Sequence, residues 1–103
     1  MKPLKIYILI KDWIDIGHAV NGVGHAVLIL DRKYKDDPIY IDWKDNHFRK
    51  VTCKVSEQEF EDAKQYGDYI VCTEMALDNQ EIMLAFKPRE EWPKRFKYFK
   101  LYK

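Results

Sequence analysis

The amino-acid sequence predicts a small α/β domain with a mixed four-stranded β-sheet and helices packed on its faces. The first observation behind this is the length: 103 residues form one domain, spanning 1–103, with a core of its own. The second is that four short apolar segments have the composition of strands, at 4–11, 48–55, 68–75 and 81–86. The third is that two helical patterns separate the first three of them, an order typical of a mixed, helix-covered sheet.

The first half of the chain predicts a central strand followed by a long helix. The segment LKIYILIK (4–11) is almost continuously apolar, which indicates a strand covered on both faces. From about residue 15 to 34 the period changes to that of a helix. The residues expected to pack on the sheet are Ala19, Val23, Val27 and Leu30. Gly22 and Gly24 each cost this helix about 1 kcal/mol relative to Ala.

The second half predicts a connection, a strand, a short helix and a hairpin. The connection 33–47 is rich in Asp and Lys, with a short extended piece expected at 39–41. Alternation in 48–55 predicts a strand with one buried face. Ser56 and Glu59 have the spacing of a capping box, which opens a helix that ends at Gly67. The last two strands are joined by ALDNQ (76–80).

Composition limits the classes of partner. A net charge of +1 excludes a global basic field, although 56–68 has five acids and one Lys, and 92–103 has five basic residues and no acid. Cys53 and Cys72 lack metal-site spacing and are expected to be buried thiols. The apolar run before Lys11 has only five residues, so we expect no membrane partner and a cytoplasmic location.

The stretch GHAVNGVGHAV (17–27) contains two histidines and three glycines. His18 and His25 lie about 10.5 Å apart on a helix, so they cannot share one metal ion, and we expect no metal site. The glycines match no phosphate-binding loop, although an anion site at the helix start near Gly17 stays open. His18, Gly22 and His25 are expected on a polar face where Gly22 leaves room for a ligand or a chain segment. The alternative is that both histidines are ordinary surface or partly buried residues.

Several motifs follow one another in a recognisable order. KIYILIKDW (5–13) leads to GHAVNGVGHA (17–26), Trp43 precedes KVTCKV (50–55), and SEQEF (56–60), IMLAFKP (82–88) and YFKLYK (98–103) follow. In this order and spacing the chain resembles the type II peptidyl-tRNA hydrolases of archaea and eukaryotes. That family has a strand ending in Arg-x-Asp-Leu and a Gly-Lys-x-Ala-Ala-Gln-x-x-His-Ala helix, which lies on 17–26 without a gap. The resemblance covers about residues 4–102.

The chain departs from the family at the site itself. The family's motif Lys is His18 here, its Gln is Gly22, and its Ala-Ala pair is Val20-Asn21. The family's Asp-Ala-Gly-x-Thr loop is shortened in TEMALDNQ (73–80), where Glu74 is the nearest match to the Asp.

The resemblance implies hydrolysis of the ester between a peptide and the 3′ end of tRNA, with water and no cofactor. His18 would be the general base and Glu74 would orient it or the water. Backbone N–H groups or Lys11 would stabilise the oxyanion, and His25 would support the site. The candidate substrate- or RNA-binding residues are Lys11, Asp12, Asn21, Gly22, His25, Thr73, Asp78, Lys94, Arg95 and Lys97.

The basic, aromatic C-terminal segment has two interpretations. Its cations can hold phosphate while its rings stack on unpaired bases. Alternatively the rings are buried, with Phe96, Phe99 and Leu101 pointing inward. Two functions stay open as well. One is a divergent hydrolase acting on peptidyl-tRNA; the other is a catalytically degenerate member that binds an RNA end, a nucleotide or a protein partner, with a homodimer as a further possibility.

Overall fold

A central strand organises the domain, as its continuous apolar sequence predicts. A computed structural model describes residues 2–103. The strands are β1 (Lys5–Lys11), β2 (Arg49–Val55), β3 (Tyr69–Glu74), β4 (Gln80–Phe86) and β5 (Lys100–Leu101). The α-helices are α1 (Ile16–Tyr34), α2 (Pro38–Asp42) and α3 (Glu57–Ala63). A π-helical turn η1 (Trp43–His47) and the 3₁₀ turns η2 (Lys64–Tyr66), η3 (Met75–Leu77) and η4 (Lys94–Tyr98) complete the secondary structure.

The sheet has five strands in the order β3-β4-β1-β2-β5, so the prediction of four was wrong. It is mixed, as predicted: β1 runs parallel to β2 and antiparallel to β4. The additional strand is β5, which pairs Lys100 with Lys54 and Leu101 with Cys53. Two residues are too few to show a strand period in the sequence, so only the pairing with β2 defines this strand.

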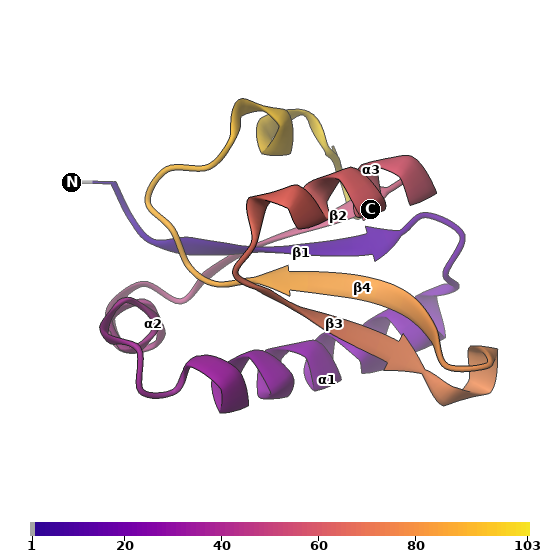
Figure 1. The fold of residues 1–103 in the computed structure, drawn as a ribbon, viewed down its shortest axis with the longest axis horizontal. Helices are drawn as coiled ribbons and strands as arrows, with labels where there is room; N and C mark the ends of the chain where they lie inside the picture. The colour runs from indigo at the N-terminus through magenta and orange to yellow at the C-terminus, as the bar shows by residue number, and fades with distance from the viewer. Residues whose placement is uncertain (1) are drawn as a thin grey trace.

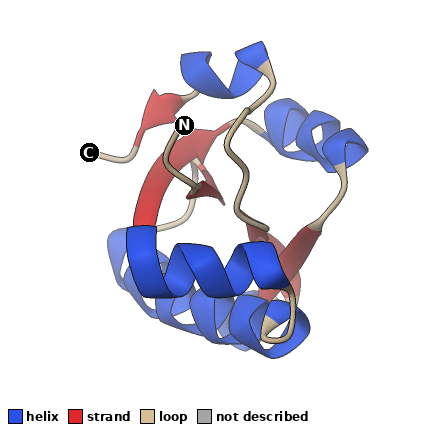
Figure 2. Cartoon of the chain, turned by 90° about the vertical axis from the view of Figure 1, so that its left-hand side faces the viewer, coloured by secondary structure: helices blue, strands red, loops and turns tan. Residues whose placement is uncertain are grey.

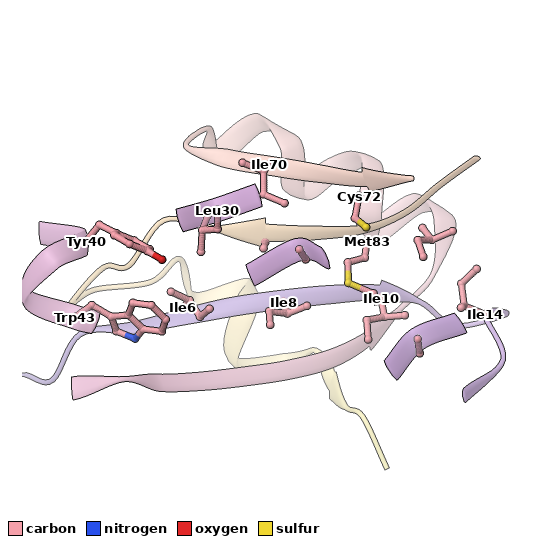
Figure 3. Packing of buried hydrophobic residues seen from close by; sticks show 14 of the residues in the cluster. Ile6, Ile8, Ile10, Ile14, Leu30, Tyr40, Trp43, Ile70, Cys72 and Met83 are labelled. Carbon is pink, nitrogen blue, oxygen red and sulfur yellow. The ribbon is translucent and has the colours of Figure 1, made fainter. Parts of the chain in front are cut away.

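One face of the sheet is covered by α1 and α2 (Figure 1), and Trp43 of η1 packs in the same core. Alternate β1 residues Ile6, Ile8 and Ile10 point to this side, where Figure 3 shows them among the other buried side chains. The buried residues of α1 are Ala19, Gly22, Ala26 and Leu30. Val23 and Val27, predicted to lie on the sheet, are only partly buried. Ala19, Gly22 and Ala26 are buried in place of the valines because small side chains let the helix axis lie closer to the sheet.

The other face is covered by α3 and the C-terminal segment, so that helices lie on both sides of the sheet (Figure 2). Tyr7 and Leu9 of β1 meet Phe60 of α3 and a group of aromatic rings here. Phe96 is the centre of that group, with ring centroids 5.0–5.5 Å from those of Tyr7, Tyr66, Phe86, Trp92 and Phe99. Phe96 and Phe99 point inward as predicted, but Leu101 is 50% exposed and does not.

The connection 33–47 is helical, so the extended piece expected at 39–41 was wrong. The Asp37 side chain caps α2 by accepting from the backbone N–H groups of Ile39 and Tyr40, and Pro38 follows as the first helical residue. Tyr40 and Trp43 are both buried against the sheet, which holds this turn in place. The capping box of Ser56 and Glu59 at the start of α3 is confirmed.

Candidate functional site

The start of α1 carries a hydrogen-bonded pair of ionisable side chains. Asp15 is the residue before the helix and has an extended backbone, and its side chain makes no capping hydrogen bond. Instead, Asp15 Oδ1 lies 2.5 Å from His18 Nδ1, one helical turn later. The start of α1 lies at the end of the sheet where β1 and β3 finish (Figure 1). A carboxylate on Nδ1 orients the imidazole and leaves Nε2 to accept a proton.

The two side chains shift each other's acidity. The hydrogen bond to Asp15 raises the pKa of His18 above its ordinary value, and the negative charges of Asp15 and Glu74 raise it further. The same hydrogen bond to His18 lowers the pKa of Asp15. His18 is thereby made a stronger base than a free imidazole, and its protonated form is stabilised.

The hairpin between β3 and β4 brings Glu74 within electrostatic range of His18. Glu74 is the last residue of β3, and its side chain accepts from the Ala76 N–H at 3.1 Å, while its carbonyl accepts from the Asn79 N–H at 2.9 Å. Thr73 is exposed beside a bulge in the strand, and Asp78 has a left-handed backbone in the turn. The structure therefore groups Thr73, Glu74 and Asp78 at one hairpin tip. Asp15, rather than Glu74, makes the hydrogen bond that orients His18.

Asp15 is the residue that the sequence interpretation missed. The available signal was its position three residues before His18 at a helix start, a spacing at which side chains on a helix meet. Among residues 2–103, no three His, Cys, Asp or Glu side chains are grouped so that they could hold a metal ion.

Gly22 does not leave room for a ligand, which corrects the expected polar face. It is buried against the sheet, and a Cβ atom there would lie 2.7 Å from Met83 Cε and 3.2 Å from Ile82 Cδ1. Its carbonyl lies 3.8 Å from Cys72 Sγ. Figure 3 shows Cys72 and Met83 among the side chains of this core. Asn21 and His25 are exposed on α1.

Lys11 is the last residue of β1 and Asp12 follows it, but neither joins His18. Alternation places the Lys11 side chain on the opposite face of the sheet, where it is 8% exposed. Its Nζ lies 3.1 Å from Glu57 Oε2 and 4.6 Å from the centre of the Phe60 ring. Asp12 is exposed, and its backbone N–H donates to the Val55 carbonyl.

The predicted RNA contacts of the C-terminal segment also lie on that opposite face. Lys94, Arg95 and Lys97 belong to η4, which packs through Phe96 on the side of α3. Arg95 is 3.6 Å from Asp62 Oδ2, whereas Lys94 and Lys97 are exposed. The structure therefore separates these cations from His18 by the thickness of the sheet.

Two hollows are found elsewhere on the surface. A hollow of about 720 Å³ lies at the far end of the sheet and is lined by Leu4, Pro38, Ile39, Asp42, Asp68, Lys87, Pro88, Arg89, Glu90 and Glu91. A smaller, apolar hollow of about 210 Å³ lies beside α1 and is lined by Ile10, Ala19, Val20, Val23, Thr52 and Tyr102. Neither hollow is lined by His18.

Among the described residues, no helix is both long and apolar enough to cross a membrane. No model of a known protein family and no curated protein matches this chain.

Proposed function

We propose that this protein is a divergent hydrolase that cleaves the ester between a peptide and the 3′ end of tRNA. The observation that carries the proposal is the hydrogen bond between Asp15 and His18 at the open end of α1. A histidine with one nitrogen fixed by a carboxylate is the arrangement that general-base catalysis uses. In this role His18 takes the place of the Lys in the family that the chain resembles.

The reaction needs one proton transfer in each direction. His18 Nε2 removes a proton from water while the water oxygen bonds to the ester carbonyl carbon. The bond from that carbon to the ribose oxygen then breaks, and the proton passes from His18 to the ribose oxygen. Asp15 holds the imidazole in position throughout. Glu74 favours the protonated imidazole through its charge.

The negative charge on the carbonyl oxygen requires donors, and Lys11 is on the wrong face to be one. The first N–H groups of a helix have no intrahelical partner. The His18 N–H is one of these in α1, but it interacts with the Asp15 carboxylate. The N–H groups of Ile16 and Gly17 are the others, and the Asp15 side chain does not cap them. They also lie at the positive end of the helix dipole, which favours an anion. The proposal assigns them to the oxyanion.

The arrangement of the motifs supports the resemblance. KIYILIK and KVTCKV form strands β1 and β2, GHAVNGVGHA lies in α1, SEQEF starts α3, and IMLAF is in β4. These five motifs thus have the strand and helix assignments expected for them, and this agreement supports the proposal.

Turnover of tRNA carrying an N-blocked amino acid tests the proposal. We expect deacylation that His18→Ala abolishes and His25→Ala leaves within about twofold, because His25 is exposed two turns along the helix. The rate should rise with pH as His18 loses its proton, with a midpoint above the ordinary histidine value of about 6.5. Absence of turnover, or equal loss in both variants, would contradict it.

A second candidate function is a binding module without catalysis. The observation in its favour is that the 720 Å³ hollow lies at the end of the sheet away from His18. A module of this kind would bind an RNA end, a nucleotide or a protein partner. Tight binding of tRNA or nucleotide without turnover, unaffected by His18→Ala, would favour this function over hydrolysis.

A further inference from the structure

The pairing of β5 with β2 joins two basic segments that lie far apart in the sequence. Neither FRKVTCKV (48–55) nor KYFKLYK (97–103) contains an acidic residue. Lys54 is directly opposite Lys100, and the Tyr102 N–H donates to the Thr52 carbonyl at 2.9 Å. A chain with a net charge of only +1 therefore concentrates positive charge along one edge of its sheet.

Three of these lysines share the face of the sheet that carries α1. In the parallel pairing of β1 with β2, Lys50 is opposite Ile6, Thr52 is opposite Ile8, and Lys54 is opposite Ile10. The three isoleucines pack beneath α1, so the side chains of Lys50, Thr52 and Lys54 point to the same side. Lys100, opposite Lys54, joins them.

The cations of this edge are not neutralised by acids. Among the described residues, no Asp or Glu carboxylate lies within 4 Å of Lys50, Lys54 or Lys100, whereas Lys11, Lys44 and Lys64 each have such a partner. An unpaired ammonium group keeps its full attraction for an anion.

Two of the three ammonium groups are also held in place. Lys50 Nζ is 3.6 Å from the centre of the Phe48 ring and donates to the Phe48 carbonyl at 3.1 Å. Lys54 Nζ is 4.8 Å from the Tyr102 ring and donates to a main-chain oxygen of Lys103, the last residue of the sequence, at 3.1 Å. Cation–π contacts fix the groups without removing their charge. Their Cα atoms are about 13 Å apart along the strand, at 3.3 Å per residue.

The small apolar hollow lies between these cations. Thr52, which separates Lys50 from Lys54 on this face, forms part of its lining, as does Tyr102. Ala19 and Val20 of α1 line the other side, next in sequence to His18. At about 210 Å³ the hollow is smaller than the roughly 300–1,000 Å³ typical of pockets for drug-sized ligands. It offers an apolar wall and one ring to a single flat group.

We propose that this surface binds the single-stranded 3′ end of tRNA, with phosphates on Lys50, Lys54 and Lys100 and one unpaired base in the hollow beside Tyr102. The identity of the RNA rests on the proposed function. Phosphate contacts and base stacking together are how proteins hold single-stranded nucleic acid. An anionic lipid surface would also attract the cations, but it would not fill the recessed apolar hollow that lies between them.

Binding of deacylated tRNA tests this site without any ester chemistry. Lys50 and Lys100 are exposed, so Lys50→Glu/Lys100→Glu should fold normally, which circular dichroism checks. Arg32→Glu/Lys35→Glu is the matched control, with the same charge change at exposed positions near the C-terminal end of α1. Binding is followed by fluorescence anisotropy at several salt concentrations.

We expect Lys50→Glu/Lys100→Glu to weaken the affinity for tRNA at least about tenfold at low salt. The control Arg32→Glu/Lys35→Glu should change this affinity less than about threefold. Three phosphate contacts predict a slope of log affinity against log salt of about −2, which should fall by more than half. A tRNA with its unpaired 3′ nucleotides should bind more tightly than one trimmed to a blunt end.

Three results would overturn the site. The first is an equal loss of tRNA affinity in Lys50→Glu/Lys100→Glu and in the control variant, and the second is no preference for tRNA with an unpaired 3′ end. The third is binding to anionic phosphatidylglycerol vesicles without binding to tRNA. His18→Ala should bind tRNA normally. Binding that depends on Lys50 and Lys100 in a protein without turnover would therefore refute the hydrolase but not this site. Turnover that survives with unchanged binding in Lys50→Glu/Lys100→Glu would refute this site alone.

Discussion

The His18 imidazole is 2.5 Å from the Asp15 carboxylate within a single helical turn, so this pair is built by the start of α1 itself. The third charge near it, Glu74, comes from a hairpin that follows far along the chain. The pair therefore depends on local backbone geometry, whereas its electrostatic surroundings depend on the fold.

Asp15→Asn should lower the pKa of His18 toward the ordinary value of about 6.5, because the neutral amide keeps the shape but not the charge of the carboxylate. Histidine C–H chemical shifts followed by NMR against pH measure this directly. In the hydrolysis assay the midpoint of the pH profile should move to lower pH with it. An unchanged pKa would show that Asp15 does not act on His18.

The same pair gives the stability of the protein a defined pH window. The pKa of His18 is raised on folding, so its contribution is present at low pH and is lost as pH rises through the folded value. The pKa of Asp15 is lowered, so its contribution is lost as pH falls through its folded value. Urea unfolding of wild type and Asp15→Asn should therefore differ most between these two values, and a constant difference across pH would contradict the pairing.

Gly22→Gln should destabilise the protein by about 1–3 kcal/mol, because even a Cβ at this position crowds Met83 and Ile82. Introducing at 18 and 22 the Lys and Gln of the family that the chain resembles is therefore expected to damage the core before it can raise activity. Gly24→Ala is the control: no atom lies within 4 Å of its added Cβ, so it should stabilise α1 by about 0.5–1 kcal/mol. Urea denaturation of both variants measures whether the free energy of unfolding falls in Gly22→Gln and rises in Gly24→Ala. Similar stabilities would contradict the packing at Gly22.

Lys11→Met should leave hydrolysis within about twofold of wild type, because Lys11 lies on the face of the sheet opposite His18. The Met side chain can keep the apolar contact with Phe60. Glu57→Ala, by contrast, should lower the free energy of unfolding by about 1–2 kcal/mol. The change removes the carboxylate that pairs with Lys11 and accepts the hydrogen bond of the Trp13 N–H. Kinetics and urea unfolding of both variants check this, and loss of turnover in folded Lys11→Met would place Lys11 in the reaction after all.

Phe96→Ala should cost about 3–5 kcal/mol of unfolding free energy, because its ring is buried among five other aromatic rings. Tyr98→Ala, two residues away and 76% exposed, should change stability by less than about 0.5 kcal/mol. Equal effects in denaturation would mean that the C-terminal segment does not form part of the core.

Much of the architecture was predictable because it follows from local patterns. The apolar run of β1, the period of α1 and the capping box at Ser56 each define an element within a few residues. The helix at 38–42 was also signalled, by Asp37 before Pro38, but its many charged neighbours suggested a connection. For the candidate site, the sequence placed His18 near Glu74 through a resemblance, and it did not identify Asp15 as the partner of His18.

By itself the sequence determined strands β1 to β4 and helices α1 and α3, because hydrophobic period and capping act over a few residues. Only the tertiary structure decided which side of each element is used. The packing of α1 on the sheet made Gly22 a buried contact rather than an opening. Because side chains alternate along β1, Lys11 lies on the face of the sheet opposite His18. The pairing of β5 with β2 places Lys100 beside Lys54. These outcomes depend on contacts between residues far apart in the chain, which no local pattern encodes.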